Sequence, residues 1–183
     1  MKPIANSQKP RVVTLGGGGG HAAVVRALKD LPIELTAICN TVDDGGSSGQ
    51  LMQEYGVHHP GEVRQILSAL SPSDALEYRF PKGTLQGLSI GNMLLAGLEL
   101  KLHSFGEAIE QVRSWLGISH VVTPLTENNP VLHARTTTGK EIVGQANVAT
   151  SIRSKNAEPY ETIFITPSES KVSGAARKAL MSA

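Results

Sequence analysis

Five consecutive glycines, Gly16 to Gly20, are the feature that most constrains this chain. They follow the apolar run Val12-Val13-Thr14-Leu15, and a helical pattern of apolar residues starts directly after them. An ordinary turn does not need five glycines, because each one costs backbone entropy on folding. Glycines let backbone N–H groups approach a ligand closely, and the following helix adds its positive N-terminal end. Residues 11–15 and 21–30 are therefore interpreted as a strand and a helix that flank an anion-binding loop, typical of phosphate sites.

Three interpretations of this loop compete. A Walker A loop requires Lys and then Ser or Thr after the last glycine, and His21-Ala22 stand there instead, so that interpretation fails. The looser dinucleotide pattern GxGxxA is met by Gly17, Gly19 and Ala22, but one match within a glycine run is weak evidence. A flexible turn without a ligand is the third interpretation.

A second glycine-rich loop follows the apolar strand predicted over 33–39. Because a strand, a helix and a strand in this order form a right-handed parallel unit, both loops should lie at the carboxyl edge of one sheet, where ligands bind. Asp43 and Asp44 suit a hard cation such as Mg²⁺, or the hydroxyl groups of a sugar or ribose. The residues after them are candidates for binding phosphate, the serines also for capping the next helix: Gly45, Gly46, Ser47 and Ser48.

Composition narrows the class of protein. The 183 residues are 40% hydrophobic but only 4% aromatic, which predicts an aliphatic core. Lys and Arg number 17 against 16 Asp and Glu, a balance that argues against nucleic-acid binding. A single cysteine, Cys39, lies in an apolar strand and fits a reducing, cytoplasmic setting. We find no signal-peptide core and no apolar run of about 18 residues, so no membrane span is expected. Residues 1–10 are expected to form a disordered tail.

The rest of the chain is predicted to be helical up to about residue 118 and rich in strands after it. The expected helices lie at 48–55, from Pro60-Gly61 to Leu70, and at 73–79, 89–102, 105–116 and 172–182. The helix at 89–102 is apolar nearly all round, which is typical of a central, buried helix. The expected strands lie at 121–125 and 162–165, with a hairpin of 131–135 and 140–144 between them.

Two of these helices carry further candidate site residues. Arg64 lies in a first helical turn, where a cation opposes the helix dipole unless an anion binds there. Gly61 precedes it, and Ser89, Gly91 and Asn92 begin the apolar helix, where capping and tight packing are the alternatives to ligand binding. The adjacent pair His58-His59 is a poor metal site, because neighbouring histidines on a loop seldom chelate one ion.

Four segments, in order, resemble the motifs of the CofD-like family of 2-phospho-L-lactate transferases and gluconeogenesis factors. The family's GGGTG, ADDGGSSGR, PPGDIRN and GHSLGNLLLAAL patterns correspond to residues 16–20, 42–50, 59–65 and 87–98. The resemblance covers nearly all of the chain. It implies an α/β fold with a Rossmann-like parallel sheet and helices on both faces. The alternating pattern described above adds a region with a β-hairpin after about residue 118. It also implies a nucleotide-bearing ligand across the two glycine loops.

The chain departs from the family pattern in ways that remove or displace polar groups. The departures are Gly19 for Thr, Gln50 for Arg, Glu62 for Asp, Gln65 for Asn and Leu88 for His. Family members are also longer, and their later half carries another glycine-rich loop next to the first. Residues 1–183 are therefore expected to be a single, incomplete domain whose open strand edge favours homo-oligomers.

The resemblance implies one of two activities. The transferase branch moves a phospholactyl group from a guanosine diphosphate donor to a deazaflavin precursor with Mg²⁺, whereas the gluconeogenesis factors bind nucleotide-sugars and regulate carbon use, envelope synthesis and cell shape. The helix start without His favours the second branch. We expect a nucleotide-sugar-binding regulator that does not catalyse a reaction. Mg²⁺ is the candidate cofactor, and none is required by this interpretation. The alternatives are an Mg²⁺-dependent transferase, in which Asp44 would hold the metal, and an NAD-dependent oxidoreductase.

Overall fold

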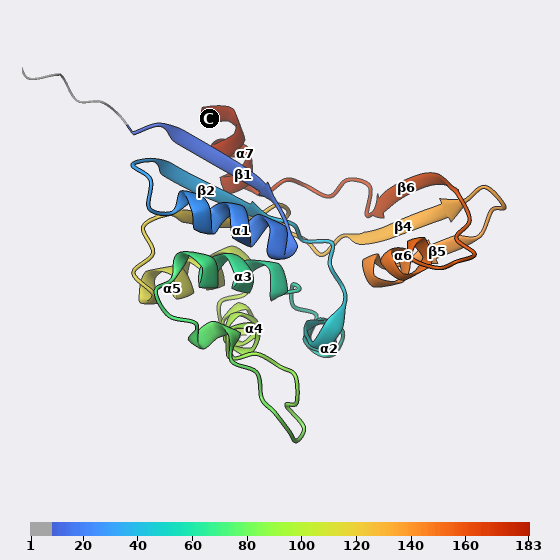
Figure 1. Ribbon diagram of the computed structural model, residues 1–183, viewed down its shortest axis with the longest axis horizontal. Coiled ribbons are helices and arrows are strands. Elements are labelled where there is room, and N and C mark those ends of the chain that lie inside the picture. The colour runs from blue at the N-terminus through green and yellow to red at the C-terminus, as the bar shows by residue number, and fades with distance from the viewer. Residues whose placement is uncertain (1–8) are drawn as a thin grey trace, which may run out of the picture.

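The protein, described here over residues 9–183 of a computed structural model, consists of an α/β part and a smaller antiparallel lobe that extends from its side (Figure 1). Three parallel strands form the first sheet in the order β1 (Arg11–Gly16), β2 (Glu34–Cys39), β3 (Val121–Pro124). The antiparallel lobe, residues 131–166, contains β4 (Val131–Thr136), β5 (Glu141–Val143), α6 (Gln145–Ile152) and β6 (Tyr160–Thr166). The predicted hairpin is confirmed as β4 and β5, and β6 pairs with the other edge of β4.

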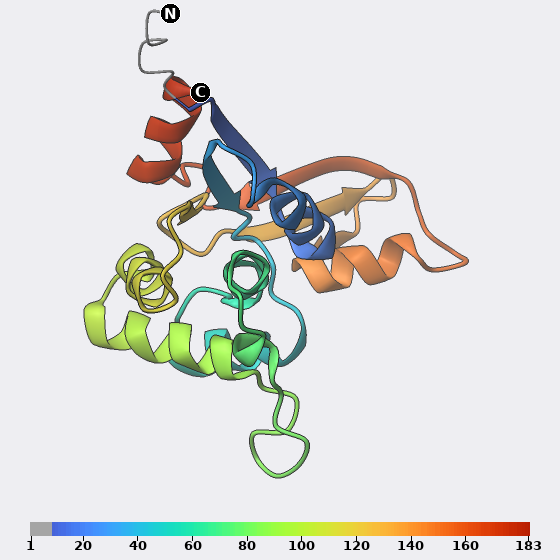
Figure 2. The ribbon, with the colours of Figure 1, turned by 60° about the vertical axis from the view of Figure 1, so that its left-hand side comes forward.

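Helices cover both faces of the parallel sheet, as predicted. The helices α1 (Gly18–Leu28), α3 (Gly61–Leu70) and α5 (Phe105–Trp115) pack on one face, and α7 (Gly174–Ser182) contacts β1 and β3 from the other (Figure 2). The elements α2 (Gly46–Tyr55), η1 (Ala75–Glu77) and α4 (Ile90–Leu102) lie beyond α3, away from the sheet.

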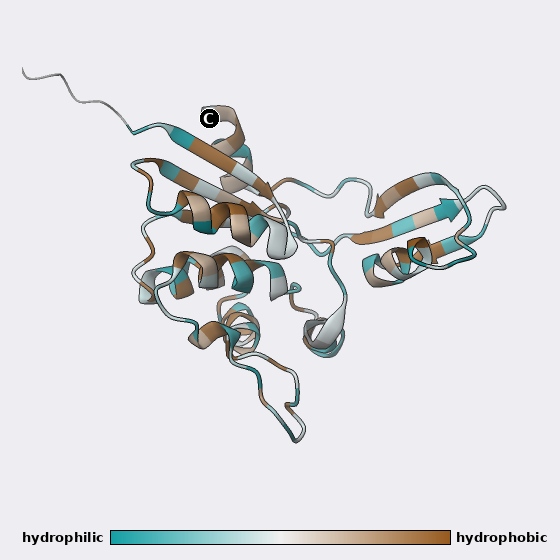
Figure 3. Ribbon diagram, viewed as in Figure 1, coloured by the Kyte–Doolittle hydropathy of each residue, from teal (hydrophilic) through white to brown (hydrophobic). Residues whose placement is uncertain are grey.

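The core between the sheet and these helices is aliphatic, as the composition predicted. Apolar residues gather along β1 and β2 and on the helices beside them (Figure 3). Leu35, Ala37 and Cys39 of β2 pack against Ile66, Leu67 and Ile109. Cys39 is fully buried, and burial raises the pKa of its thiol far above the usual range.

Two helix predictions need correction. The helix at 89–102 is not central: its buried residues are confined to one side, and Ile90 and Leu100 are 40% and 45% exposed. The helix forms an outer layer against α5 and η1, so part of its apolar surface faces solvent. The stretch 73–79 forms only the short turn η1.

Two helices begin earlier than predicted, and a third helix was not predicted at all. The first helix begins at Gly18, within the glycine run, and the second begins at Gly46 rather than at 48. The helix α6 was not predicted, because Val148 is its buried residue and eight residues with so little apolar periodicity give no helical signal.

Two chain segments join the antiparallel lobe to the α/β part. They meet at Thr126 and Val172, which form an isolated antiparallel bridge, and the Ser173 N–H donates to the Leu125 carbonyl at 2.8 Å. The Asn129 side-chain amide adds a 3.1 Å bond to the carbonyl of Val57. None of the helices within residues 9–183 is long and apolar enough to cross a membrane.

Candidate functional site

Two helices start at the carboxyl edge of the parallel sheet with a glycine as the N-cap residue, which has no side chain to cap the helix. The N-cap residues of α1 and α2 are Gly17 and Gly45, which follow β1 and β2. By contrast, α4, α5 and α7 begin with serines whose hydroxyl groups accept an N–H of the first turn. The first N–H groups of a helix have no intrahelical partner and attract anions. The predicted glycine loops thus place two helix starts without a capping side chain of their own on the same edge of the sheet.

The five glycines of the first loop divide into packed and open positions. A Cβ on Gly16 would lie 3.2 Å from His21, and one on Gly17 would lie 2.8 Å from a Glu62 oxygen. At Gly18, Gly19 and Gly20 a Cβ would meet nothing within 4 Å, and Gly18 has a φ of 65°. The space above the start of α1 is therefore open to a ligand, while the first two glycines are required by packing.

Glu62, in the first turn of α3, reaches into this open end. Its carboxylate accepts a hydrogen bond from the Gly18 N–H, and its side chain is nearly buried. A carboxylate at a helix N-terminus is stabilised by the same N–H groups and dipole that would stabilise a phosphate. The loop thus already holds one anionic group of the chain itself.

The two aspartates of the second loop have different neighbours. Asp43 accepts a bond from the Gly45 N–H at 3.1 Å, which closes the turn, and its other oxygen lies 3.6 Å from His59 Nδ1. Asp44 accepts a 2.9 Å bond from the Ala146 N–H in the first turn of α6. Asp43 therefore shapes the loop, and Asp44 ties it to the antiparallel lobe.

His59, in the loop just before α3, fixes the second glycine loop. It is 6% exposed, and its Nε2 lies 2.8 Å from the Gly45 carbonyl, to which it donates a hydrogen bond. Its ring also lies against Gly61, where a Cβ would be only 2.8 Å from His59 Cε1. The third motif thus orders the second loop, and Gly61 is glycine because His59 packs there.

A buried polar chain links the last three motifs. Ser48 accepts a 2.5 Å bond from the Asn92 amide, and the Asn92 carbonyl oxygen accepts a 3.0 Å bond from Arg64 Nε. The guanidinium of Arg64 also pairs with Glu77. Burial, with a smaller effect of Arg79, lowers the pKa of Arg64 to about 10. The charge of Arg64 is therefore balanced by Glu77 within the protein rather than left to a ligand.

Other predicted residues pack rather than line open space. The Ser89 hydroxyl caps α4 by accepting the Asn92 N–H at 3.2 Å. A Cβ at Gly91 would lie 2.8 Å from the Arg64 side chain, so this glycine permits close packing of α4 on α3.

Gly46, with a φ of 65°, borders open space at the start of α2. The side chain of Ser47 lies outside the described residues.

Sequence reasoning placed the four motifs together but missed three residues that hold them. These are Glu62, His59 and Glu77. For Glu62 a signal existed, because an acidic residue in a first helical turn beside a glycine loop is a candidate for the neighbouring helix end. Glu77 lies in a segment without a motif, and only the fold brings it to Arg64.

A metal site is not preformed at the aspartates. Each carboxylate already accepts a backbone N–H, and the second oxygen of Asp44 lies against Gly144. Across residues 9–183 we find no cluster of three or more His, Cys, Asp or Glu side chains that could hold a metal ion. The arrangement does not fit an Mg²⁺ ion held by protein ligands alone.

Comparison with known proteins gives concordant matches. A family model described as 2-phospho-L-lactate transferase CofD matches residues 12–183. A putative gluconeogenesis factor of Thermoanaerobacterium thermosulfurigenes is 35% identical over 176 residues, covering 93% of this chain and 54% of the relative. The gluconeogenesis factor of Bacillus subtilis is 33% identical over 168 residues, covering 88% and 51%. The chain thus spans about half the length of these curated relatives.

A solved structure agrees with these matches. The crystal structure of a UPF0052 family member from Bacillus halodurans matches with a TM-score of 0.87 at 32% identity, covering 94% of this chain and 56% of that chain. The similarity therefore includes the antiparallel lobe as well as the parallel sheet.

Proposed function

The chain belongs to the CofD family of 2-phospho-L-lactate transferases, and from that premise we propose that it is a nucleotide-sugar-binding regulatory factor of the gluconeogenesis-factor type. Its role would lie in the control of carbon metabolism and of the cell envelope and cell shape, inside the cytoplasm. The names of relatives at 33–35% identity support this branch of the family. The absence of His at position 88, where Leu stands, also favours it over the transferase branch.

One observation carries the proposal: α1 and α2 begin with glycine N-caps at the same edge of one parallel sheet. We place the diphosphate of the ligand across these two helix ends, against the N–H groups of Gly19, Gly20 and Gly46. Two helix starts with glycine N-caps supply N–H donors for two phosphates without a lysine or arginine. The sugar or ribose would then face the second loop, where Asp43 is the partly exposed carboxylate.

In this proposal the buried polar chain of Ser48, Asn92 and Arg64 positions the second loop and does not touch the ligand. If a magnesium ion takes part, the ligand phosphates must supply most of its ligands, since Mg²⁺ commonly binds through one or two carboxylates plus phosphates and water. Asp44 would have to leave Ala146 to join it.

A thermal-shift screen tests the function. The panel contains UDP-glucose, GDP-mannose, GDP and NAD, each with and without Mg²⁺. We expect a nucleotide-sugar to raise the melting temperature with little effect of the metal. Stabilisation by GDP that requires Mg²⁺, together with turnover of a guanosine diphosphate donor, would favour the transferase. Stabilisation by NAD alone would favour the oxidoreductase, and no shift with any ligand would refute nucleotide binding by this chain.

A further inference from the structure

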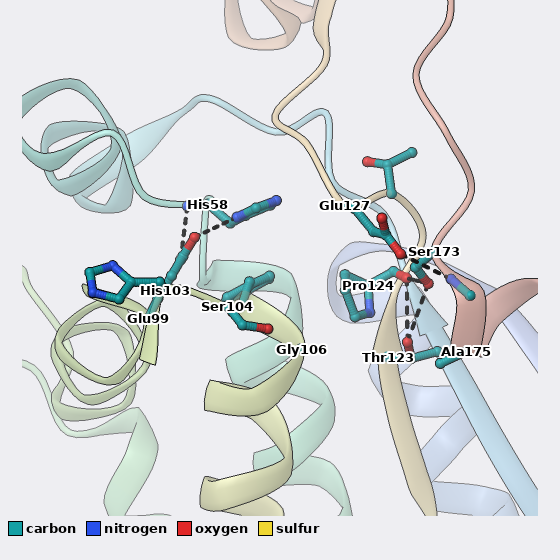
Figure 4. A pocket seen from close by; sticks show the side chains of 13 residues that line it. His58, Glu99, His103, Ser104, Gly106, Thr123, Pro124, Glu127, Ser173 and Ala175 are labelled. Carbon is teal, nitrogen blue, oxygen red and sulfur yellow. Dashed lines mark hydrogen bonds and ion pairs between the residues drawn. The ribbon is translucent and has the colours of Figure 1, made fainter. Parts of the chain in front are cut away.

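A pocket lies at the end of β3, and none of the glycine-loop residues lines it. It has a volume of about 430 Å³ and is bounded on one side by the turn between α4 and α5 and on the other by the start of α7 (Figure 4). This volume lies in the range of small-molecule sites. The proposed diphosphate site makes no use of it.

His58 is held rigidly at the wall of this pocket. Its backbone N–H and its ring Nδ1 both contact the Glu99 carboxylate, at 3.0 and 2.6 Å. The ring also stacks on Phe105 with centroids 4.7 Å apart. Because a carboxylate only accepts hydrogen bonds, Nδ1 carries the proton. In the neutral ring the opposite nitrogen, Nε2, is then a hydrogen-bond acceptor whose position is fixed.

This acceptor has no partner within the described part of the chain. His58 is 8% exposed, and its Nε2 is buried without a hydrogen bond. In Figure 4 the ring points away from Glu99 and across the pocket toward the wall that carries Glu127. A buried acceptor without a donor costs free energy, so such an atom calls for an explanation.

The antiparallel lobe contains a second histidine that contacts a glutamate and a phenylalanine in the same way, but its Nε2 has a hydrogen-bond partner. There His133 Nδ1 lies 2.8 Å from Glu141, and the ring stacks on Phe164 at 5.0 Å. Its Nε2, however, lies 2.8 Å from the Thr166 hydroxyl. A histidine fixed by a glutamate and a phenylalanine thus finds a hydroxyl donor in one place and faces a pocket in the other.

The remaining walls indicate which ligand fits. Glu99 and Glu127 bring two carboxylates to the pocket. The Glu127 carboxylate accepts the Gly174 N–H at 3.2 Å, and its negative charge offsets the positive end of the α7 helix dipole. An anion would meet these charges. The first N–H groups of α5, at Phe105 and Gly106, have no intrahelical partner and can donate to a ligand. Hydroxyl groups both donate and accept hydrogen bonds, so they match a pocket that offers carboxylate acceptors and N–H donors.

We propose that this pocket binds an uncharged, hydroxyl-rich ligand of the carbohydrate class, with a ligand hydroxyl donating its hydrogen bond to His58 Nε2. The carboxylate of Glu127 takes a second hydroxyl, and the N–H groups at the start of α5 donate to ligand oxygens. Pro124 and Phe105 supply apolar surface for the ring carbons. The site is separate from the diphosphate site and does not depend on it.

Nitrogen NMR of ¹⁵N-histidine-labelled protein tests the proposal directly. D-glucose, myo-inositol and inorganic phosphate are the three probes. The wild-type spectrum should show the Nδ1–H tautomer of His58, and glucose or inositol should shift its Nε2 resonance. His58→Gln should weaken saccharide binding by at least about tenfold, equivalent to about 1.4 kcal/mol. The matched control, His133→Gln, removes the satisfied histidine and should leave saccharide binding unchanged.

Three results would overturn the proposal: no shift of Nε2 with either saccharide, equal saccharide binding by wild type and His58→Gln, or a shift with phosphate alone. If His58→Gln does not fold, the wild-type titration still decides. Calorimetry with nucleotide-sugars on the same samples keeps the two sites distinct. A wild-type protein that binds one kind of ligand but not the other refutes only the site of the ligand that does not bind, and His58→Gln should lose saccharide binding while it keeps nucleotide-sugar binding.

Discussion

The backbone N–H of Gly18 donates a hydrogen bond to the carboxylate of Glu62, so the start of α1 holds an acidic side chain from α3. This carboxylate occupies part of the space that the proposed diphosphate needs. A phosphate that binds there meets a like charge and must displace it or share the helix end. The position of Glu62 thus indicates that this helix start attracts anions. The same carboxylate competes with a ligand phosphate for the N–H groups there.

Replacing Glu62 by Gln should therefore tighten nucleotide-sugar binding. The amide keeps the size of the side chain and removes the charge, so we expect a gain of about tenfold in affinity by calorimetry. Loss of the charged hydrogen bond should lower the free energy of unfolding by about 1 kcal/mol. The control is Glu107→Gln, which removes a carboxylate from the first turn of α5. Weaker binding by Glu62→Gln would mean that Glu62 contacts the ligand favourably.

Asp44→Asn should act on the antiparallel lobe rather than on the ligand. The Asp44 carboxylate accepts the Ala146 N–H at the start of α6, and the neutral amide makes a weaker interaction with that helix end. We expect the free energy of unfolding to fall by about 0.5–1 kcal/mol and the nucleotide affinity to stay within about threefold. An affinity loss of about 1.5–3 kcal/mol would instead return Asp44 to the ligand, as the sequence alone suggested.

Asn92→Ala should destabilise the fold strongly. Asn92 is fully buried, donates to Ser48 and accepts from Arg64, so its loss leaves a buried guanidinium with one partner fewer. We expect a cost of about 3 kcal/mol, which lowers the melting temperature by about 6–12 °C in a domain of this size. Asn156→Ala, at an exposed position, is the matched control. Equal melting temperatures for the two variants would show that the polar chain adds little to stability.

His21 should make stability depend on pH. Burial lowers the pKa of His21 from 6.5, with a smaller opposing effect of the Gly16 backbone. Below about pH 6.5 the unfolded chain then takes up a proton that the folded protein resists, so the free energy of unfolding falls as the pH falls. Urea unfolding at several pH values should show a smaller fall for His21→Gln than for wild type. His120→Gln serves as the control, and identical pH profiles for wild type and His21→Gln would contradict this role.

Periodicity and glycine patterns predicted the parallel unit of β1, α1 and β2, the glycine loops and the hairpin because those features are local. Tertiary partners were not predictable in the same way. Nothing in the sequence indicates that Asp44 meets α6, since 102 positions separate it from Ala146. Arg64 matched the pattern of an anion-binding residue because its partner Glu77, whose side chain is 40% exposed, lies in a segment without a motif. The exposed side of α4 escaped prediction because apolar residues cover most of that helix.

The open glycines of the first loop differ in whether they can accept a side chain. Gly18 has a φ of 65°, so any larger residue there strains the backbone whether or not a ligand binds. Gly19 and Gly20 have no such constraint, and a Cβ at either would meet nothing within 4 Å. The family pattern has Thr at the position of Gly19 and glycine at that of Gly20, so a side chain at Gly20 is the one expected to fill the proposed ligand space while meeting no atom of the protein within 4 Å.

Calorimetric titration of Gly20→Val with the nucleotide-sugar that stabilises the wild type tests the proposed diphosphate site. Gly97→Val is the matched control, because Gly97 is also helical, exposed and free of neighbours within 4 Å. If the diphosphate binds across the starts of α1 and α2, Gly20→Val should fold and lose at least about tenfold in affinity, while Gly97→Val binds like wild type. A folded Gly20→Val that binds the nucleotide-sugar as tightly as Gly97→Val would contradict this placement of the diphosphate.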